Sequence, residues 1–185
     1  MTVVLAALLG YLAGAVSPAA LAARAKGVDL RAVGSGNPGA ANAGRALGRR
    51  TGVVVAVLDV AKGAVPAAVL GAVDHRLGLV AGVAAVLGHV TSPFLRGRGG
   101  KGVATAAGAI LGSHPLWVAA VLVVWLAVLA ASRWIALASV CAALSVLVVA
   151  LLVDRDVGWA AALAAIVVLR HQGNFVRRLR RRPQP

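Results

Sequence analysis

Apolar residues occur along this chain in seven segments that are separated by short polar connections. The segments cover residues 3–23, 53–73, 77–95, 103–111, 116–131, 135–153 and 158–168. About 20 consecutive apolar residues are enough for a helix to cross the hydrocarbon core of a bilayer. The pattern therefore predicts an all-α integral membrane protein with about seven transmembrane helices, short loops and a single domain over residues 1–185. The fourth segment is short, so it needs tilt or neighbouring helices if it is to span the membrane.

The distribution of positive charge predicts the orientation of these helices. No positive residue precedes residues 3–23, whereas a cleaved signal peptide begins with one, so we expect a retained helix with its N-terminus outside. In that topology 16 of the 19 Lys and Arg residues fall in inner segments, and only Arg76 and Arg155 fall in outer ones. Because positive residues stay on the cytoplasmic side, we predict an odd number of crossings and a cytoplasmic C-terminus. The basic tail, residues 177–185, would then be available to anionic lipid headgroups.

The composition of the chain narrows the classes of chemistry that it can support. Apolar residues make up 61% of the chain, well above an ordinary soluble domain, so a water-soluble globule is excluded. The chain has five Asp and no Glu, which excludes acid–base pairs that contain Glu. Its one cysteine, Cys141, permits neither a disulfide within the chain nor a thiolate metal cluster.

The first of three unusual inner segments is glycine-rich and covers residues 34–45, with the sequence GSGNPGAANAGR. It contains a formal G-x-G-x-x-G pattern, but no predicted strand precedes it, so the pattern does not indicate a dinucleotide site. We expect Asn37 to cap a short helix that begins at Pro38. The free amides of that helix, together with Ser35 and Arg45, would suit a phosphate. The alternative is a flexible loop that packs on neighbouring helices.

The second segment follows the third apolar segment and has the sequence GHVTSPFLRGRGGKGVAT from Gly88. It is not a Walker A loop, because the residue five before Gly100 is Leu95 and no Ser or Thr follows Lys101. Gly99 and Gly100 nevertheless stand just before a predicted helix, where unpaired amides and the helix dipole favour an anion. Lys101 adds a full positive charge there. The alternative is that this segment only sets the orientation of the neighbouring helices in the membrane. That role would need the cations but not the glycines.

The third segment, HQGN at residues 171–174, lies at the inner end of the last apolar segment. His171 and Asn174 are three residues apart and can share a helix face, so the amide could orient the imidazole or hold a substrate. The alternative is a solvated interfacial histidine. Within the second apolar segment Asp59 and Lys62 have the same spacing and can neutralise each other, either as a structural pair or as a functional one.

Together these three motifs resemble those of the bacterial acyl-phosphate:glycerol-3-phosphate acyltransferases, a family of small polytopic membrane enzymes that begin phospholipid synthesis. The order and spacing of the motifs match, and D-x-x-K-G at residues 59–63 and Ser139 are also similar to family features. The chain departs from the family pattern at three places: Ala41, where Thr is usual, Gly97-Arg98, where Phe-Lys is common, and Pro183, where the third motif normally ends in Glu.

The resemblance implies transfer of a fatty acyl group from an acyl phosphate to the 1-hydroxyl of sn-glycerol 3-phosphate, giving lysophosphatidic acid and inorganic phosphate without a cofactor or a metal. It implies a site on the cytoplasmic side of the bacterial plasma membrane, with membrane lipid but not nucleic acid as a partner. The residues that it implies to be catalytic are Ser35, Arg45, Lys101, His171 and Asn174. The residues that it implies to bind phosphate are Gly34, Gly36, Asn37, Gly99, Gly100, Gly102 and Ser139.

Both substrates of that reaction carry phosphate, so the site must hold roughly three to four negative charges. The donor is already activated, so the protein need only position and neutralise it, with either His171 or the donor phosphate as the base. The H-x-x-x-x-D motif of other glycerolipid acyltransferases is absent, because no Asp follows a His at that spacing. A small permease for anions or phosphate esters is the competing function. It predicts polar residues that reach both sides of the membrane, whereas the glycine-rich segments all fall on the predicted inner side.

Overall fold

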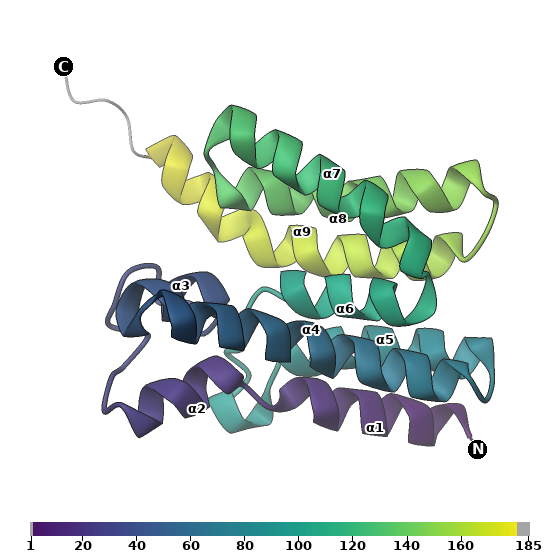
Figure 1. The fold of residues 1–185 in the computed structure, drawn as a ribbon, viewed down its shortest axis with the longest axis horizontal. Helices are drawn as coiled ribbons and strands as arrows, with labels where there is room; N and C mark the ends of the chain where they lie inside the picture. The colour runs from purple at the N-terminus through teal and green to yellow at the C-terminus, as the bar shows by residue number, and fades with distance from the viewer. Residues whose placement is uncertain (1, 181–185) are drawn as a thin grey trace. The chain divides into compact units, whose positions relative to one another are not determined.

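The computed structural model describes residues 2–180, and every regular element in that part of the chain is a helix (Figure 1). The described residues form nine α-helices and one short 3₁₀ helix. In chain order these are α1 (Val3–Ala15), α2 (Pro18–Ala25), α3 (Ala40–Leu47), α4 (Arg49–Gly71), α5 (His75–Val90), η1 (Pro93–Leu95), α6 (Val103–Ser113), α7 (Pro115–Ser132), α8 (Ile135–Leu152) and α9 (Val157–Arg180). The prediction of an all-α protein is confirmed.

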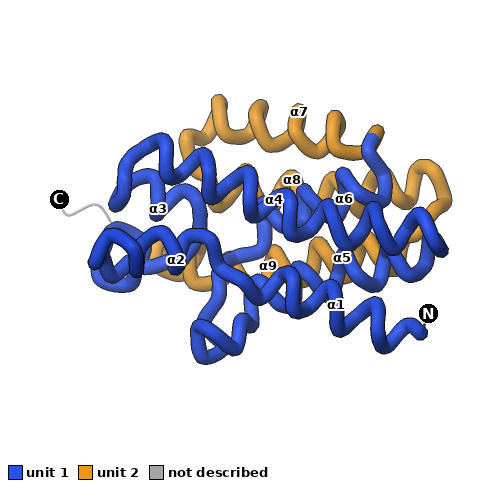
Figure 2. The backbone as a smooth tube through the Cα atoms, turned by 60° about the horizontal axis from the view of Figure 1, so that its bottom comes forward, with its two compact units in different colours: residues 1–115 blue, residues 116–185 orange. Residues whose placement is uncertain are grey.

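The chain divides into two compact units, residues 1–115 and residues 116–185 (Figure 2). In the first unit α1 packs along α5, and α4 packs on α3, α5 and α6. In the second unit α8 packs on α9. The first two glycine-rich segments therefore belong to the first unit and HQGN belongs to the second. The description of residues 1–185 as a single membrane domain stays a prediction.

Five helical stretches among the described residues are long and apolar enough to cross a membrane. They are Val3–Ala25, Arg49–Gly71, His75–Leu95, Pro115–Ser132 and Ile135–Leu152. Helix α6 coincides with the fourth predicted segment but has only 11 residues. Helix α9 has 24 residues, and its apolar first half is followed by HQGN and several arginines. Several apolar helices are typical of an integral membrane protein, and the number of seven crossings stays a prediction.

The first predicted span is interrupted, which corrects the expectation of one helix over residues 3–23. Helix α1 ends at Ala15 and α2 begins at Pro18, because proline has no N–H with which to continue the hydrogen bonding of α1. Ser17 caps α2, since its Oγ accepts a hydrogen bond from the Ala20 amide at 3.2 Å. The chain therefore changes direction inside an apolar segment.

Two side chains from other parts of the first unit bind the backbone carbonyls at this break. Ser92 Oγ donates to the Ala15 carbonyl at 2.6 Å, and Lys62 Nζ donates to the Val16 carbonyl at 2.7 Å. Ser92 follows α5 and Lys62 lies in α4, so the break is attached to both helices. These bonds stabilise the break, because backbone groups in a bilayer interior have no water to pair with.

Two further helix ends differ from the ends of the apolar segments. Helix α5 ends at Val90 rather than Leu95, since Pro93 disfavours the helical conformation of the residue before it and begins η1. Helix α9 continues past Val168 to Arg180. The HQGN motif is therefore helical, and the hydrophobic pattern alone places its helix end too early.

Helices of the first unit approach one another closely at small residues. Helix α1 presents Gly14 to the backbone of Ala85 on α5, and α6 presents Gly108 to the backbone of Val60 on α4. A methyl group at either glycine would overlap a carbonyl oxygen of the facing helix. Membrane helices gain little hydrophobic driving force from one another, so this close contact is what stabilises their association.

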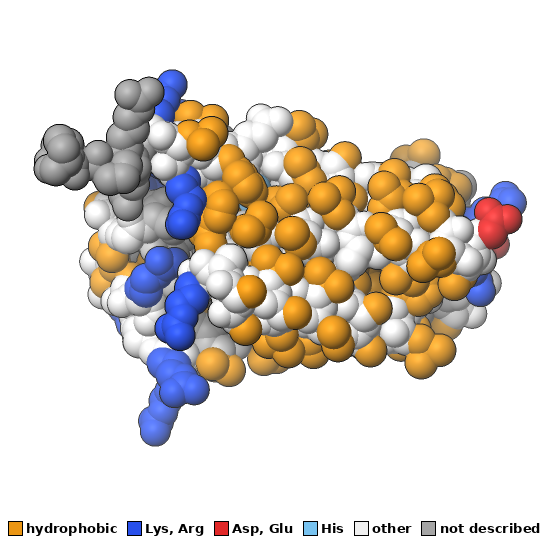
Figure 3. Space-filling model, turned by 90° about the horizontal axis from the view of Figure 1, so that it is seen from above, with side chains coloured by type: hydrophobic (Ala, Val, Ile, Leu, Met, Phe, Trp, Pro, Cys, Tyr) orange, Lys and Arg blue, Asp and Glu red, His pale blue; other side chains and the backbone are white. Residues whose placement is uncertain are grey.

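The second unit leaves apolar side chains exposed along its helices, and none of the residues of α7 is buried. In the view of Figure 3, hydrophobic side chains cover most of the visible face. Near the end of α9 the Arg178 guanidinium lies 4.6 Å from the centre of the Trp134 ring, and that ring also contacts Phe175. Apolar sides with a basic, aromatic end suit lipid tails and headgroups respectively.

The predicted basic tail, residues 177–185, is described only in part. Residues 177–180 form the last turn of α9, so this part of the tail is helical. Residues 181–185, which include Pro183, lie outside the described residues.

Gly108→Ala should lower the stability of the protein, because its methyl group would overlap the Val60 carbonyl and push α6 away from α4. The expected loss is about 1–3 kcal/mol of unfolding free energy, as for other overpacked interiors. Gly158→Ala is the matched control, since nothing lies within 4 Å of a methyl group at that position. Thermal unfolding in detergent should show a lower midpoint for Gly108→Ala alone, and equal midpoints for the two variants would contradict the packing described here.

Candidate active site

The first glycine-rich segment forms a loop that leads into α3, but the helix begins later than expected. Gly39 precedes α3 and Ala40 is its first residue, so the predicted roles of Asn37 as cap and Pro38 as first helical residue are wrong. The Gly39 amide instead donates to the Asn37 carbonyl at 2.9 Å, which forms a tight turn before the helix. No side chain caps the start of α3.

Asn42 organises this loop from within α3. Its side-chain nitrogen donates to the carbonyls of Leu30 and Val33 at 2.9 and 3.0 Å. Its side-chain oxygen accepts a hydrogen bond from the Ser35 amide at 3.0 Å. Asn42 is only 1% exposed, and a methyl group at Gly34 would overlap its oxygen. One buried side chain thus binds three backbone groups, so the loop is anchored rather than loosely packed.

The polar side chains predicted to act from this loop are accessible. Ser35 and Arg45 are both exposed, and Asn37 is half-buried. Arg45 Nε donates to the Ala41 carbonyl one turn earlier on α3, at 3.1 Å. The loop therefore presents a hydroxyl and a guanidinium to any phosphate that reaches its surface.

The second glycine-rich segment returns from η1 along the last turn of α5. The Gly99 amide donates to the Val90 carbonyl and the Gly100 amide donates to the His89 carbonyl, each at 3.2 Å. Both glycines are buried, and a methyl group at Gly100 would overlap Nε2 of His89. The segment can follow this path because it has no side chains at the two positions that touch α5.

Helix α6 starts immediately after this segment, as predicted. Gly102 precedes it in the left-handed conformation, with φ of +82°, and no side chain caps its first amides. Amides at a helix start and the positive end of the helix dipole favour an anion. The half-buried Lys101 brings a positive charge to the same place. The segment can therefore bind a phosphate group through both its backbone and Lys101.

Arg31 joins the two glycine-rich segments. Its Nη2 atom donates to the Arg98 carbonyl at 3.0 Å and to the Leu95 carbonyl at 3.5 Å. Its own amide donates to Asp29 Oδ1 at 2.9 Å, just before the first segment begins. Two motifs that are far apart in the sequence are therefore held together within the first unit.

Asp59 and Lys62 form the ion pair that their spacing predicts. Lys62 Nζ lies 2.9 Å from Asp59 Oδ1, and the two side chains are 9% and 3% exposed respectively. His89 Nδ1 lies 3.6 Å from the same carboxylate oxygen. Lys62 also donates to the Val16 carbonyl at the break between α1 and α2. The pair is thus part of a buried polar cluster that also includes His89.

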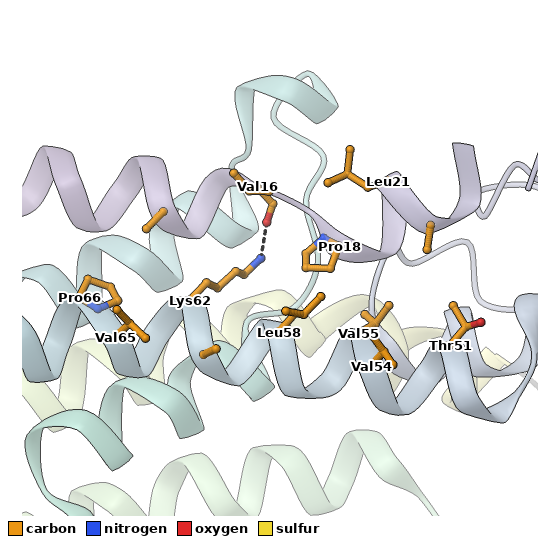
Figure 4. Close-up of a pocket in the computed structure, with 13 residues that line it drawn as sticks. Val16, Pro18, Leu21, Thr51, Val54, Val55, Leu58, Lys62, Val65 and Pro66 are labelled. Atoms are coloured by element: carbon orange, nitrogen blue, oxygen red, sulfur yellow. Dashed lines mark hydrogen bonds between the residues drawn. The ribbon is translucent and has the colours of Figure 1, made fainter. Parts of the chain in front are cut away.

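An apolar pocket of about 530 Å³ lies between α1, α2 and α4 (Figure 4). Its lining residues are Ala13, Val16, Pro18, Leu21, Ala22, Thr51, Val54, Val55, Leu58, Ala61, Lys62, Val65 and Pro66. Figure 4 shows Lys62 reaching across to the Val16 carbonyl, with aliphatic side chains on either side. Thr51 and Lys62 are the polar members of a lining that otherwise suits a hydrocarbon chain.

The remaining predicted residues lie in the second unit. His171 is 2% exposed and its Nδ1–H donates to the Val167 carbonyl at 2.7 Å, so it is not a solvated interfacial side chain. Asn174 lies three residues further along the same helix and is half-buried. Ser139 is also buried, and its Oγ accepts a hydrogen bond from Trp125 Nε1 at 3.4 Å.

Sequence reasoning missed three residues that shape the two glycine-rich segments, namely Asn42, Arg31 and His89. A single buried Asn in a short helix produces no periodic signal, and Arg31 counts only as one more inner cation. His89 stands beside a glycine within the second motif, which is the one feature that could have drawn attention to it. All three act through contacts between segments, and such contacts become visible only when the chain is folded.

Comparison with known proteins identifies the family of this chain. Residues 4–181 match the family model that describes glycerol-3-phosphate acyltransferase. The chain is 43% identical over 178 residues to the glycerol-3-phosphate acyltransferase of Geobacter sulfurreducens, which covers 93% of this chain and 91% of the relative. It is 42% identical over 184 residues to glycerol-3-phosphate acyltransferase 1 of Deinococcus radiodurans, with 95% of this chain and 91% of the relative covered.

The fold is similar to crystal structures of PlsY (YgiH), an integral membrane glycerol 3-phosphate acyltransferase. The match to its glycerol 3-phosphate form has a TM-score of 0.91 at 35% identity and covers 96% of this chain and 92% of that chain. The match to its lysophosphatidic acid form has a TM-score of 0.89 at 34% identity, with the same coverage. The chain therefore belongs to the glycerol-3-phosphate acyltransferase family of integral membrane enzymes.

Proposed function

We propose that this enzyme moves a fatty acyl group from an acyl phosphate to the 1-hydroxyl of sn-glycerol 3-phosphate, forming lysophosphatidic acid and inorganic phosphate. The observations that carry the proposal are the junction of the two glycine-rich segments through Arg31 and the uncapped start of α6, which follows the second segment. Both substrates carry phosphate, and this junction combines backbone amides with Lys101 and the exposed Arg45 in one unit. The solved relatives in glycerol 3-phosphate and lysophosphatidic acid forms support the same acceptor and product.

The chemistry requires little of the protein beyond position and charge. The bond between the acyl carbon and the phosphate oxygen breaks, and its electron pair leaves with phosphate. An ester bond forms to the acceptor oxygen, whose proton passes to Nε2 of His171 or to the leaving phosphate. The uncapped amides at the start of α6 and the Lys101 ammonium would stabilise the phosphate charge. Because the donor is already activated, holding the two substrates together accounts for most of the expected rate gain.

The other residues in the proposed site are assigned by their chemistry. Ser35 and Arg45 would bind the acceptor phosphate from the first segment. His171 and Asn174 would act from α9, where they lie three residues apart on one helix. The further groups proposed to bind phosphate are Gly34, Gly36, Asn37, Gly99, Gly100, Gly102 and Ser139.

The apolar pocket between α1, α2 and α4 supports a site for the acyl chain. Its lining is aliphatic over most of its surface, so the hydrocarbon tail of an acyl donor would contact mainly apolar side chains there. Lys62 is held within it by Asp59 and the Val16 carbonyl, and apart from Thr51 the rest of the lining is apolar. A chain held here would keep the reacting carbonyl of the donor inside the first unit.

We further propose that the enzyme crosses the bacterial cytoplasmic membrane seven times, with its N-terminus outside, its C-terminus inside and its active site on the cytoplasmic side. The 16 inner cations among 19 support this orientation. The contact from Arg31 to the second segment supports one common side for the first two motifs. A permease with polar residues on both sides of the membrane is correspondingly disfavoured.

Purified enzyme in detergent should acylate glycerol 3-phosphate with palmitoyl phosphate and release phosphate in equal amount to product. Palmitoyl-CoA and palmitoyl carrier protein should be poor donors, because a phosphate-binding segment does not stabilise a thiolate leaving group. Lys101→Ala should lower turnover by about 100-fold or more. Arg155→Ala is the control, since Arg155 is exposed and pairs with Asp156. Comparable rates with a thioester would contradict the proposed donor, and no turnover with any acyl donor would favour the permease.

Leu58→Trp should shift the preference of the enzyme towards shorter acyl phosphates, because the indole would fill part of the apolar pocket that Leu58 lines. Val57→Trp is the matched control, since Val57 is the neighbouring residue, is 61% exposed and does not line the pocket. The measurement is kcat/KM for a series of acyl phosphates of increasing chain length. The same chain-length profile in both variants would show that the acyl chain lies elsewhere.

Cysteine labelling should reveal the topology of the chain. In a Cys141→Ala background, Arg155→Cys in intact spheroplasts should react with a membrane-impermeant maleimide, and Ala41→Cys should not. Both positions are exposed in the structure, so a difference in labelling reports the side of the membrane and not burial. After permeabilisation both should react. Labelling of Ala41→Cys from outside would place the first motif on the wrong side for the proposed orientation.

A further inference from the structure

Asp59 and His89 form a buried polar cluster with Lys62, and neither of the two is among the residues assigned to substrate above. Asp59 is 2% exposed and His89 is 6% exposed, and both lie in helices made mostly of apolar residues. A charge inside a membrane segment is costly unless it is paired, and Lys62 already neutralises Asp59 at 2.9 Å. Because Lys62 already pairs with Asp59, charge neutralisation does not explain why His89 lies beside the carboxylate.

The imidazole of His89 connects the carboxylate to the second glycine-rich segment. Its Nδ1 atom lies 3.6 Å from Asp59 Oδ1. On the opposite edge of the ring, Nε2 faces Gly100 so closely that a methyl group at Gly100 would overlap it. The ring thus stands between a carboxylate on α4 and the backbone of the segment that precedes α6.

The backbone of the same histidine also holds this segment. The Gly100 amide donates to the His89 carbonyl at 3.2 Å, and the Gly99 amide donates to the Val90 carbonyl at the same distance. A methyl group at Gly99 would overlap the His89 carbonyl oxygen. His89 therefore contacts the segment through its ring and through its main chain, and a shift of the ring would be transmitted to Gly100.

We propose that Asp59 and His89 are positioning residues for the phosphate-binding segment, residues 99–102. Asp59 orients the imidazole from α4, and the imidazole supports Gly100, so that the amides at the start of α6 keep the geometry that a phosphate needs. Neither side chain touches the substrate in this scheme. The inference rests on the proposed function, because it takes residues 99–102 as a phosphate site.

The test measures binding of inorganic phosphate to the full-length protein in detergent by calorimetry, with no acyl donor and no turnover. His89→Leu should weaken phosphate binding by about 10- to 100-fold, because a small displacement of binding groups has effects of this size. His89→Gln keeps a polar group that can reach the same neighbours and should bind phosphate nearly as well as the wild type. His75→Leu, at the opposite end of α5, is the matched control and should leave phosphate binding unchanged.

A double-mutant cycle tests whether Asp59 acts through His89. Asp59→Asn alone should weaken phosphate binding, and the double variant Asp59→Asn/His89→Leu should bind no more weakly than His89→Leu. If the two residues were merely structural, each variant would have a lower unfolding midpoint. Phosphate binding would then not be restored in His89→Gln, and the losses of binding in the two single variants would add up in the double variant. Additive losses would overturn the connection between the two residues.

The possible results separate this inference from the proposed function. Unchanged phosphate affinity in folded His89→Leu and Asp59→Asn would overturn the positioning role even if acyl phosphate proves to be the donor. If His89→Leu does not fold, the other two variants test the positioning role. Asp59→Asn should then bind phosphate weakly, and His89→Gln should bind it nearly as well as the wild type. Wild-type protein that binds no phosphate would overturn the inference together with the phosphate role of residues 99–102. Failure of the donor assay alone would leave the phosphate measurements intact.

Discussion

An interrupted helix inside an apolar protein must pair its backbone carbonyls with side chains, and this requirement connects most of the first unit. The break between α1 and α2 exposes the carbonyls of Ala15 and Val16, which Ser92 and Lys62 bind. Lys62 can serve there only because Asp59 balances its charge. The broken helix, the buried ion pair and the end of α5 are thus parts of one arrangement, and removing any one of them would leave a buried polar group unpaired.

The same arrangement determines where the second glycine-rich segment can lie. Ser92 lies just beyond the end of α5 and binds the Ala15 carbonyl at the break, and the chain then turns through η1 and returns along His89. The return is close because Gly99 and Gly100 have no side chains to separate the segment from α5. Small residues serve the helices of this unit in the same way, as at Gly14 and Gly108. Close approach of one backbone segment to another at glycine residues therefore explains both the packing of the helices and the position of the candidate site.

The features that the sequence predicts well are those that depend on residues near each other in the chain. The apolar segments predict the helices, the glycines before Val103 predict the start of α6, and the spacing of Asp59 and Lys62 predicts their ion pair. Some failures have a local cause, since Pro18 and Pro93 interrupt helices inside apolar segments, and others arise from contacts between segments. Local capping preferences favoured Asn37, but the hydrogen bonds of Asn42 to the preceding loop accompany a helix that begins at Ala40 instead.

The distribution of charge suits the proposed site, which would hold two phosphate groups in an apolar protein. Burying a cluster of cations without ligand would be costly, and the described structure buries Lys62 only with Asp59 and a carbonyl as partners. Arg45 stays exposed, and Lys101 is only half-buried. In the proposed site, much of the positive potential would instead come from backbone amides, which carry no net charge and cost little before a phosphate binds. A phosphate that enters brings the charge that these groups are placed to stabilise, so attraction arises without a permanently buried cationic cluster.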